Sequence, residues 1–218
     1  FSDSAYWIAT TFQAEPSDIL WYLLIRYPLF DEIHAYLCPA DIEPSKQNCQ
    51  QTIMGDHLAF NERSITHPEF NMQLNFINDT EHTLYLRFKT QGTYPFMLHI
   101  EDEVTLRDYL LINMAIRGAY MAMMLIMGLY NLFIFFSTRD RSYLYYSAFV
   151  ISFMLFHITY AGSAFQFLWP NYPNINHFAL PIIFSLNIIT LTLFIPKFLN
   201  LKSHSKKSFY LFRGYLAF

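Results

Sequence analysis

Hydrophobic and polar positions alternate along the first half of the chain. Leu84, Leu86 and Phe88 fall on one face of an extended backbone, whereas Arg87 and Lys89 fall on the other. This period of two, with many aromatic and β-branched residues, is typical of β-strands. The predicted strands are Tyr6–Phe12, Ile19–Tyr27, Glu32–Cys38, Phe70–Ile77, Leu84–Lys89 and Tyr94–Glu101. Six or more short strands predict a β-sandwich, and a jelly-roll-like double sheet is the simplest form of it.

The second half of the chain consists of long uncharged runs. Between residues 118 and 196 the only charged side chains are those of Arg139, Asp140 and Arg141. The nineteen uncharged residues 118–136 would extend about 28 Å as a helix, which is one bilayer crossing. The 55 uncharged residues that follow Arg141 are too many for one span and must fold back. Spans are therefore predicted at about 115–136, 142–162 and 178–199, with a fourth starting near residue 209. The predicted fold class is a β-sandwich followed by an α-helical transmembrane bundle that is truncated after three helices and the start of a fourth.

Charge differs between the two halves and predicts the topology. Residues 1–110 carry six Lys and Arg against sixteen Asp and Glu, a net charge of −10, and residues 111–218 carry a net charge of +7. Short cytoplasmic connections are enriched in Lys and Arg. The basic residues beside the spans are Arg139, Arg141, Lys202, Lys206 and Lys207, and we expect them to face the cytoplasm. Residues 1–106 are then an external domain, and residues 107–218 form the membrane region.

Two cysteines, Cys38 and Cys49, lie in the predicted external domain. An oxidising compartment favours a disulfide between them, and closing so short a loop would stabilise the fold by about 2 to 3 kcal/mol. Two unpaired thiols are the alternative. No second Cys pair or His pair at ligand spacing accompanies them, so we expect no metal site.

A polar, irregular stretch between the third and fourth predicted strands holds the candidate ligand-binding residues. Arg63 offers several fixed donors, His67 can donate or accept, and Asp56 lies nearby in the sequence. These residue types suit an anionic or sugar ligand. The alternative is that Arg63 pairs with Asp56 or Glu62 and only holds the loop in place.

Two motifs in the membrane region carry a family resemblance. Leu-Tyr-Asn-Leu at 129–132 is followed by Ser-Thr-Arg-Asp-Arg-Ser-Tyr-Leu-Tyr-Tyr at 137–146. The matching features of the external half are Tyr6-Trp7-Ile8, Gly55-Asp56, Arg63, His67-Pro68 and Leu84-Tyr85-Leu86-Arg87. In this order they resemble the bacterial seven-transmembrane receptors with diverse intracellular signalling modules (7TMR-DISM).

The resemblance implies a signal receptor. Its external domain would be a carbohydrate-binding-like sandwich that senses a small ligand, a carbohydrate or a related molecule, and its seven-helix bundle would sit in the bacterial inner membrane. A cytoplasmic output domain in the same chain, such as a diguanylate cyclase or histidine kinase, would follow. Because the sequence has no initiator Met and stops at Phe218 within the predicted fourth span, we expect it to be a fragment without that output domain.

Other function classes find little support in the sequence. No nucleophile with a paired base, glycine-rich phosphate loop or metal-ligand cluster stands out, so we expect neither catalysis within this fragment nor a cofactor. Lys202, Lys206 and Lys207 suit anionic lipid headgroups better than nucleic acid. The alternative function is a membrane-embedded enzyme or transporter with an external recognition module, which predicts ionisable residues deep within the spans. The expected partners are the bilayer, a small ligand and the output domain, and the sequence leaves open whether the chain forms a homodimer.

Overall fold

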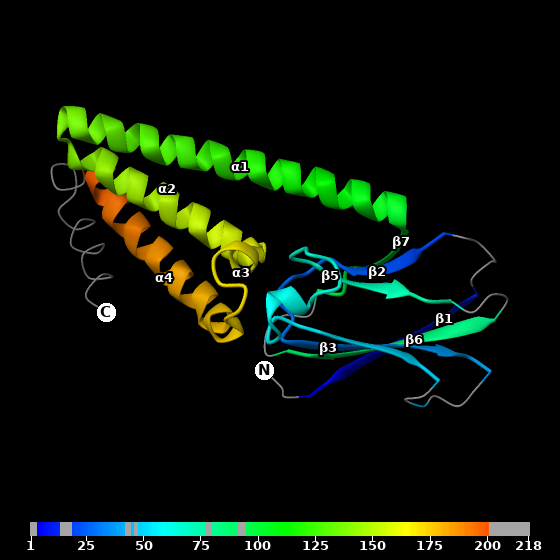
Figure 1. The fold of residues 1–218 in the computed structure, drawn as a ribbon. Coiled ribbons are helices and arrows are strands. Elements are labelled where there is room, and N and C mark those ends of the chain that lie inside the picture. The colour runs from blue at the N-terminus through cyan, green and yellow to red at the C-terminus, as the bar shows by residue number, and fades with distance from the viewer. Residues whose placement is uncertain are drawn as a thin grey trace. The chain divides into compact units, whose positions relative to one another are not determined.

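A computed structural model of the chain describes residues 4–13, 19–41, 45, 48–76, 80–90 and 95–200 (Figure 1). The predicted fourth span lies outside the described residues, as do Lys202, Lys206 and Lys207, for which the sequence predicts a cytoplasmic position. The chain divides into two compact units. The first comprises Phe1–Ile112 and Ala161–His177, and the second comprises Asn113–Tyr160 and Phe178–Phe218.

Two antiparallel sheets form the first unit (Figure 1). The four-stranded sheet has the order β1 (Tyr6–Gln13), β6 (Glu81–Lys89), β3 (Glu32–Pro39), β4 (Gln50–Met54). The three-stranded sheet has the order β5 (Phe70–Leu74), β2 (Trp21–Ile25), β7 (Leu98–Asp102). Strands that are consecutive in the chain often lie in different sheets, as in a sandwich. The predicted β-sandwich is therefore confirmed.

The core of the sandwich follows from the alternation of its strands. In β6, Leu84, Leu86 and Phe88 are buried, whereas Tyr85 and Arg87 between them face outward. The core also holds the buried residues Leu23, Ile25, Phe30, Ile33, Ala35, Leu37, Met54, Phe70, Met72 and Leu74. Five strands of the two sheets contribute these inward positions, which is the packing that a sandwich requires.

The structure adds three short elements that the sequence patterns did not predict. Strand β4 (Gln50–Met54) begins with three polar residues and pairs on one side only, with β3. The 3₁₀-helix η1 (Phe60–Glu62) lies in the loop that follows β4, and helix α3 (Ser163–Phe167) lies between two of the long helices. Their sequences are too short for a clear period.

Three helices are long and apolar enough to cross a membrane: α1 (Glu103–Thr138), α2 (Arg141–Tyr160) and α4 (Pro173–Phe198). Helix α1 begins directly after β7, where the carboxylate of Asp102 accepts hydrogen bonds from the backbone amides of Val104 and Thr105. These contacts satisfy amides at the helix start, and hydrogen bonds to the side chain and backbone of Thr105 lower the Asp102 pKa.

Polar side chains join the helices of the second unit. The Ser147 hydroxyl of α2 donates to the carbonyl of Gly128 in α1 at 2.7 Å. The hydroxyls of Ser152 in α2 and Thr190 in α4 lie 2.7 Å apart, and the Asn187 amide of α4 donates to Ser152 at 3.3 Å. Buried polar groups in a membrane bundle need such partners, because lipid offers none.

Candidate functional site

The loop of residues 55–68, here called the Arg63 loop, leaves β4 at a position that accepts only glycine. A Cβ atom on Gly55 would lie 2.2 Å from the carbonyl oxygen of Asp31, which is far inside contact distance. The close approach is held by backbone hydrogen bonds from Asp56 to Phe30 (2.9 Å) and from His57 to Asp31 (3.5 Å). Gly55 thus brings Asp56 and His57 beside Asp31.

Arg63 lies half-buried in the middle of this loop. Its Nη1 donates to the backbone carbonyls of His67 and Pro68, the first at 3.1 Å. Its guanidinium lies over the rings of Phe60 and Phe70, at 4.5 and 4.4 Å from their centroids, and 5.7 Å from that of Phe165. Burial lowers the Arg63 pKa to about 10, so the group stays charged at neutral pH. Arg63 therefore holds the loop through main-chain carbonyls and aromatic rings rather than through a carboxylate.

Asp56 connects the Arg63 loop to the segment of residues 161–177, which belongs to the same compact unit. Its Oδ2 accepts a hydrogen bond from Nδ2 of Asn176 at 3.1 Å. The side-chain oxygen of Asn176 in turn accepts a hydrogen bond from the indole of Trp169 at 3.3 Å. The backbone amide of Phe60 donates to the carbonyl of Pro170 at 2.8 Å. Since residues 161–177 run from the end of α2 into the start of α4, the Arg63 loop holds the segment that joins these two helices.

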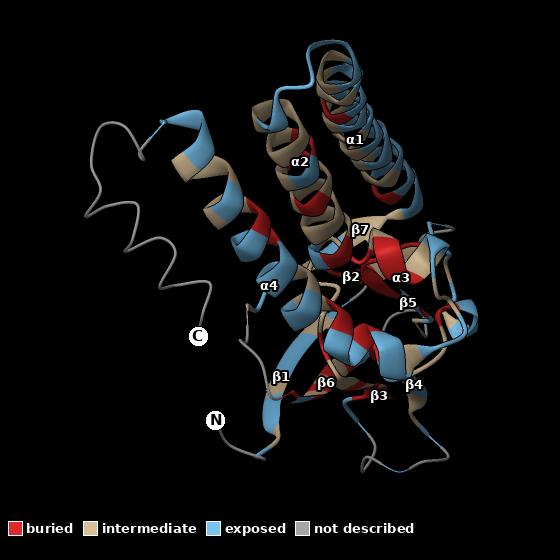
Figure 2. Ribbon diagram, turned by 90° about the vertical axis from the view of Figure 1, so that its left-hand side faces the viewer, coloured by how far each residue is buried: buried red, intermediate tan, exposed pale blue. Residues whose placement is uncertain are grey.

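Apolar contacts reinforce the same attachment. The rings of Phe60 and Phe165 meet edge to face at 5.6 Å, and Phe165 is fully buried. It lies in α3, part of which is coloured as buried in Figure 2. Gly162, with a φ of 74°, lies so close to Pro28 and Pro68 that a Cβ would come within 2.8 and 3.1 Å of them. The 161–177 segment is thus packed against the sandwich by both polar and apolar contacts.

His67 and its neighbour Glu69 connect the loop to the start of α1. The His67 side chain is buried, and its Nδ1 accepts a hydrogen bond from the backbone amide of Glu69 at 3.1 Å. The hydroxyl of Tyr109 in α1 donates to the Glu69 carboxylate at 3.1 Å, and Arg26 lies over the Tyr109 ring at 4.0 Å. The first turns of α1 are therefore tied to the sandwich by side chains as well as by the backbone.

The structure thus brings together Asp56, Arg63 and His67, the three residues that the sequence suggested for ligand binding. Each of them contacts other parts of the protein. The cavity beside Arg63 measures about 50 Å³, enough for a water molecule or two but not for a sugar. Direct ligand contact by these three side chains stays a prediction.

A second and larger hollow lies on the outer face of the four-stranded sheet. Its volume is about 340 Å³, and we call it the aromatic groove; it is lined by Trp7, Tyr36, Cys38, Ser45, Cys49, Gln51 and Tyr85. Trp7 is 60% exposed, and its ring stacks on that of Tyr36 at 6.3 Å. Tyr36 lies opposite both Tyr85 and Gln51 in the strand register, so neighbouring strands present one continuous surface. The sequence held a signal for this surface, because these aromatic residues occupy the strand positions that alternate with the core.

Charged residues adjoin the aromatic groove on the same sheet. Arg87 donates to the carboxylate of Glu32 at 3.1 Å, and His34 forms a second hydrogen bond with that carboxylate. The hydrogen bond from His34, followed by that from Arg87, lowers the Glu32 pKa although burial opposes the effect. The His34 ring also stacks on Tyr36 at 6.3 Å, which links this charged group to the groove.

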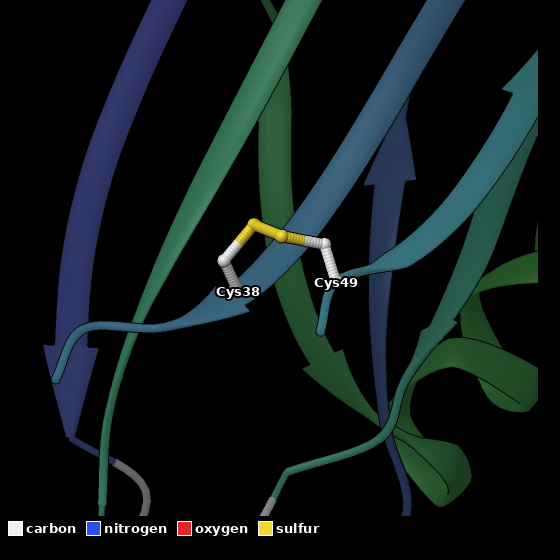
Figure 3. The surroundings of a disulfide bond; sticks show 2 residues. All are labelled: Cys38 and Cys49. Atoms are coloured by element: carbon white, nitrogen blue, oxygen red, sulfur yellow. A yellow bond between two sulfur atoms is a disulfide. The ribbon is translucent and has the colours of Figure 1, made fainter. Parts of the chain in front are cut away.

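Cys38 and Cys49 form a disulfide at the edge of the aromatic groove (Figure 3). Cys38 lies in β3 and Cys49 directly precedes β4. The bond therefore ties together the two strands that carry Tyr36 and Gln51.

The connection between α1 and α2 contains the other residues singled out in the sequence. Arg139 adopts a left-handed conformation with a φ of 58°, and its amide donates to the Phe135 carbonyl at 2.8 Å. Asp140 accepts a hydrogen bond from the Ser142 amide at 2.9 Å, which caps α2, and Ser142 lowers the Asp140 pKa. Arg141 is the first residue of α2. The turn is therefore tight and carries two exposed basic residues.

Family models match nearly the whole chain. The model for 7TMR-DISM extracellular 2 matches residues 1–102, and that for 7TM diverse intracellular signalling matches residues 113–218. The gap between the two matches contains the first turns of α1. No curated protein and no solved structure matches the chain significantly. With two models of one family in the expected order, the chain belongs to the 7TMR-DISM family and is a multi-pass membrane protein with an extracellular sensory domain.

Proposed function

We propose that this receptor binds a carbohydrate, or another small molecule with a flat apolar face, in the aromatic groove. Binding would change the attachment of the sandwich to the membrane helices and so control a cytoplasmic output domain. That domain would be a diguanylate cyclase or a histidine kinase, as the resemblance to the family implies. Family membership already makes the chain part of a transmembrane sensory receptor, and the ligand and the output are the proposal.

The observation that carries the ligand proposal is the exposed aromatic surface of the groove. Trp7 remains 60% exposed although its indole could bury a large apolar area, and Tyr36 and Tyr85 line the same hollow. At about 340 Å³ the groove falls in the size range of small-molecule sites. Such sites combine apolar walls with a few polar groups, and here Gln51 lies within the groove.

A relay is proposed from the way the groove is connected to the helices. Strand β4 carries Gln51 in the groove and leads directly into Gly55 and Asp56. Asp56 in turn binds Asn176, in the first turn of α4. A ligand that binds more tightly to one arrangement of β4 would favour the matching arrangement of the 161–177 segment. Differential affinity for two states is what this mechanism requires.

The proposed topology follows from the extracellular position of the sensory domain. Residues 1–106 would lie outside, α1 would cross the membrane once, and Arg139 and Arg141 would face the cytoplasm. Residues 107–218 would then form the membrane region of the receptor. Any catalytic activity would belong to the output domain.

The test is binding of defined sugars to the 218-residue chain in detergent. Glucose, cellotriose, mannotriose and chitotriose would be titrated while the fluorescence of tryptophan and the unfolding temperature are recorded. We expect at least one sugar to bind saturably, and Trp7→Ala to weaken that binding at least tenfold, because stacking on an aromatic ring would be lost. Tyr172→Ala is the matched control, since Tyr172 is similarly exposed at 64% and lies outside the groove.

Two results would contradict the proposed site. If Trp7→Ala binds a sugar as tightly as the unmodified chain, the ligand does not use the aromatic groove. If Arg63→Ala, rather than Trp7→Ala, abolishes binding in a chain that remains folded, the ligand contacts the Arg63 loop as the sequence first suggested.

A further inference from the structure

Three side chains that can ligate a metal converge where the Arg63 loop leaves β4. Asp31, Asp56 and His57 each present one ligand atom, and these atoms all lie within 4.8 Å of one another. His57 Nε2 is 3.9 Å from a carboxylate oxygen of Asp31 and 4.0 Å from Oδ1 of Asp56. The arrangement does not depend on flexible side chains alone, because the close approach of Gly55 to Asp31 fixes the backbone of the group.

Asp56 provides an independent sign that a cation belongs at this position. The residue is only 7% exposed, yet its Oδ1 has no hydrogen-bond partner among the described residues, whereas its Oδ2 accepts from Asn176. Leaving a buried carboxylate oxygen without a partner is costly. Burial, and after it the nearby charge of Asp31, raise the Asp56 pKa to about 6.

We propose that Asp31, Asp56 and His57 bind a divalent transition-metal ion, with Zn²⁺ as the best match. One imidazole with two carboxylates suits Zn²⁺, whereas Ca²⁺ and Mg²⁺ prefer oxygen ligands alone. Ligand atoms of a tetrahedral zinc site lie about 3.4 Å apart, so the present distances near 4 Å need only a small side-chain adjustment. His57 is the most exposed of the three, which leaves a path from solvent and a fourth coordination position.

Such an ion would stabilise the attachment of the 161–177 segment. It would neutralise Asp56, whose other oxygen holds Asn176, and it would fix His57, whose ring meets that of His177 edge to face at 5.9 Å. A bound ion would therefore stabilise the contact between Asp56 and Asn176, which is also part of the proposed relay. The metal site does not rest on the carbohydrate proposal, because none of its ligands lines the aromatic groove.

The test is metal binding to the tag-free 218-residue chain in detergent, after treatment with a chelator and its removal. Zn²⁺, Ca²⁺ and Mg²⁺ would each be titrated by calorimetry, and Co²⁺ would be added as a coloured probe of the coordination sphere. We expect one Zn²⁺ to bind per chain, Zn²⁺ to bind more tightly than Ca²⁺, and Co²⁺ to give visible absorption typical of four or five ligands.

His57→Ala is the decisive variant, because an exposed side chain can be removed without unfolding the domain. It should weaken Zn²⁺ binding at least tenfold and abolish the Co²⁺ absorption. His99→Ala is the matched control, since His99 is also partly exposed, lies beside the carboxylate of Glu101 and is outside the cluster. Zn²⁺ binding that is unchanged in both His57→Ala and Asp31→Asn would overturn the site, and tighter binding of Ca²⁺ than of Zn²⁺ would overturn the class of ion.

Discussion

Gly162→Ala should detach the 161–177 segment from the sandwich. Gly162 has a φ of 74°, and an added Cβ would lie 2.8 Å from Cβ of Pro28 and 3.1 Å from Cβ of Pro68. The left-handed conformation costs an alanine about 1 to 2 kcal/mol. Overpacking costs about 1 to 3 kcal/mol more, because proline rings cannot rotate away from the new methyl group. Together the two effects predict a loss of about 2 to 5 kcal/mol.

Hydrogen exchange is the most direct assay for this loss. The backbone amide of Phe60 donates to the carbonyl of Pro170 at 2.8 Å, so its protection reports on the attachment itself. A loss of 2 kcal/mol or more should speed exchange of this amide at least about 30-fold. The unfolding temperature of the chain in detergent should fall as well, by roughly 4 to 20 °C.

Gly118→Ala is the control for the same chemical change. Gly118 lies within α1, and nothing is within 4 Å of the position that its Cβ would take. Alanine favours a helix by up to about 1 kcal/mol over glycine, so this variant should be as stable as the unmodified chain or slightly more so. If Gly162→Ala and Gly118→Ala show the same protection of the Phe60 amide, the 161–177 segment is not packed as the structure describes.

Three further changes test other parts of the molecule. The Asp56 pKa is raised to about 6 from 3.8, so protonation of Asp56 stabilises the fold below about pH 4, and this contribution is lost as the pH rises through 6. In the presence of a chelator, Asp56→Asn should therefore gain stability relative to the unmodified chain from pH 4 to 7. Parallel curves of unfolding temperature against pH for the two chains would refute this. Reduction of the Cys38–Cys49 disulfide should lower the free energy of unfolding by about 2 to 3 kcal/mol, measured as a lower unfolding temperature on adding reductant. A double Cys→Ser variant, which has no disulfide to reduce, should show no such change. Asn187→Leu removes the hydrogen bond to Ser152 and should lower the free energy of unfolding in detergent by about 0.6 to 1.7 kcal/mol. An unchanged stability would mean that this contact contributes nothing to the bundle.

Much of the fold could be predicted from the sequence because its elements have strong local patterns. The alternation of Leu84, Leu86 and Phe88 predicted β6, and long uncharged runs predicted the spanning helices, since both signals depend only on which residues share a face. Strand β4 was missed because it lies at a sheet edge and begins Gln50-Gln51-Thr52, which has no apolar alternation. The aromatic groove was missed although Tyr36 and Tyr85 occupy strand positions that alternate with the core, because residue type alone does not separate an exposed aromatic such as Trp7 from a buried apolar residue such as Leu84.

By itself the sequence determined that an acidic β-sandwich precedes membrane-spanning helices, and its motifs determined the family. These properties depend on composition and on neighbours within a few residues. Only the tertiary structure decided what the polar residues do, because Asp56 meets Asn176, and Arg63 meets Phe165, across more than a hundred positions of the chain. The same residues that looked available for a ligand hold the 161–177 segment, since a buried charge must find its partners wherever the fold supplies them.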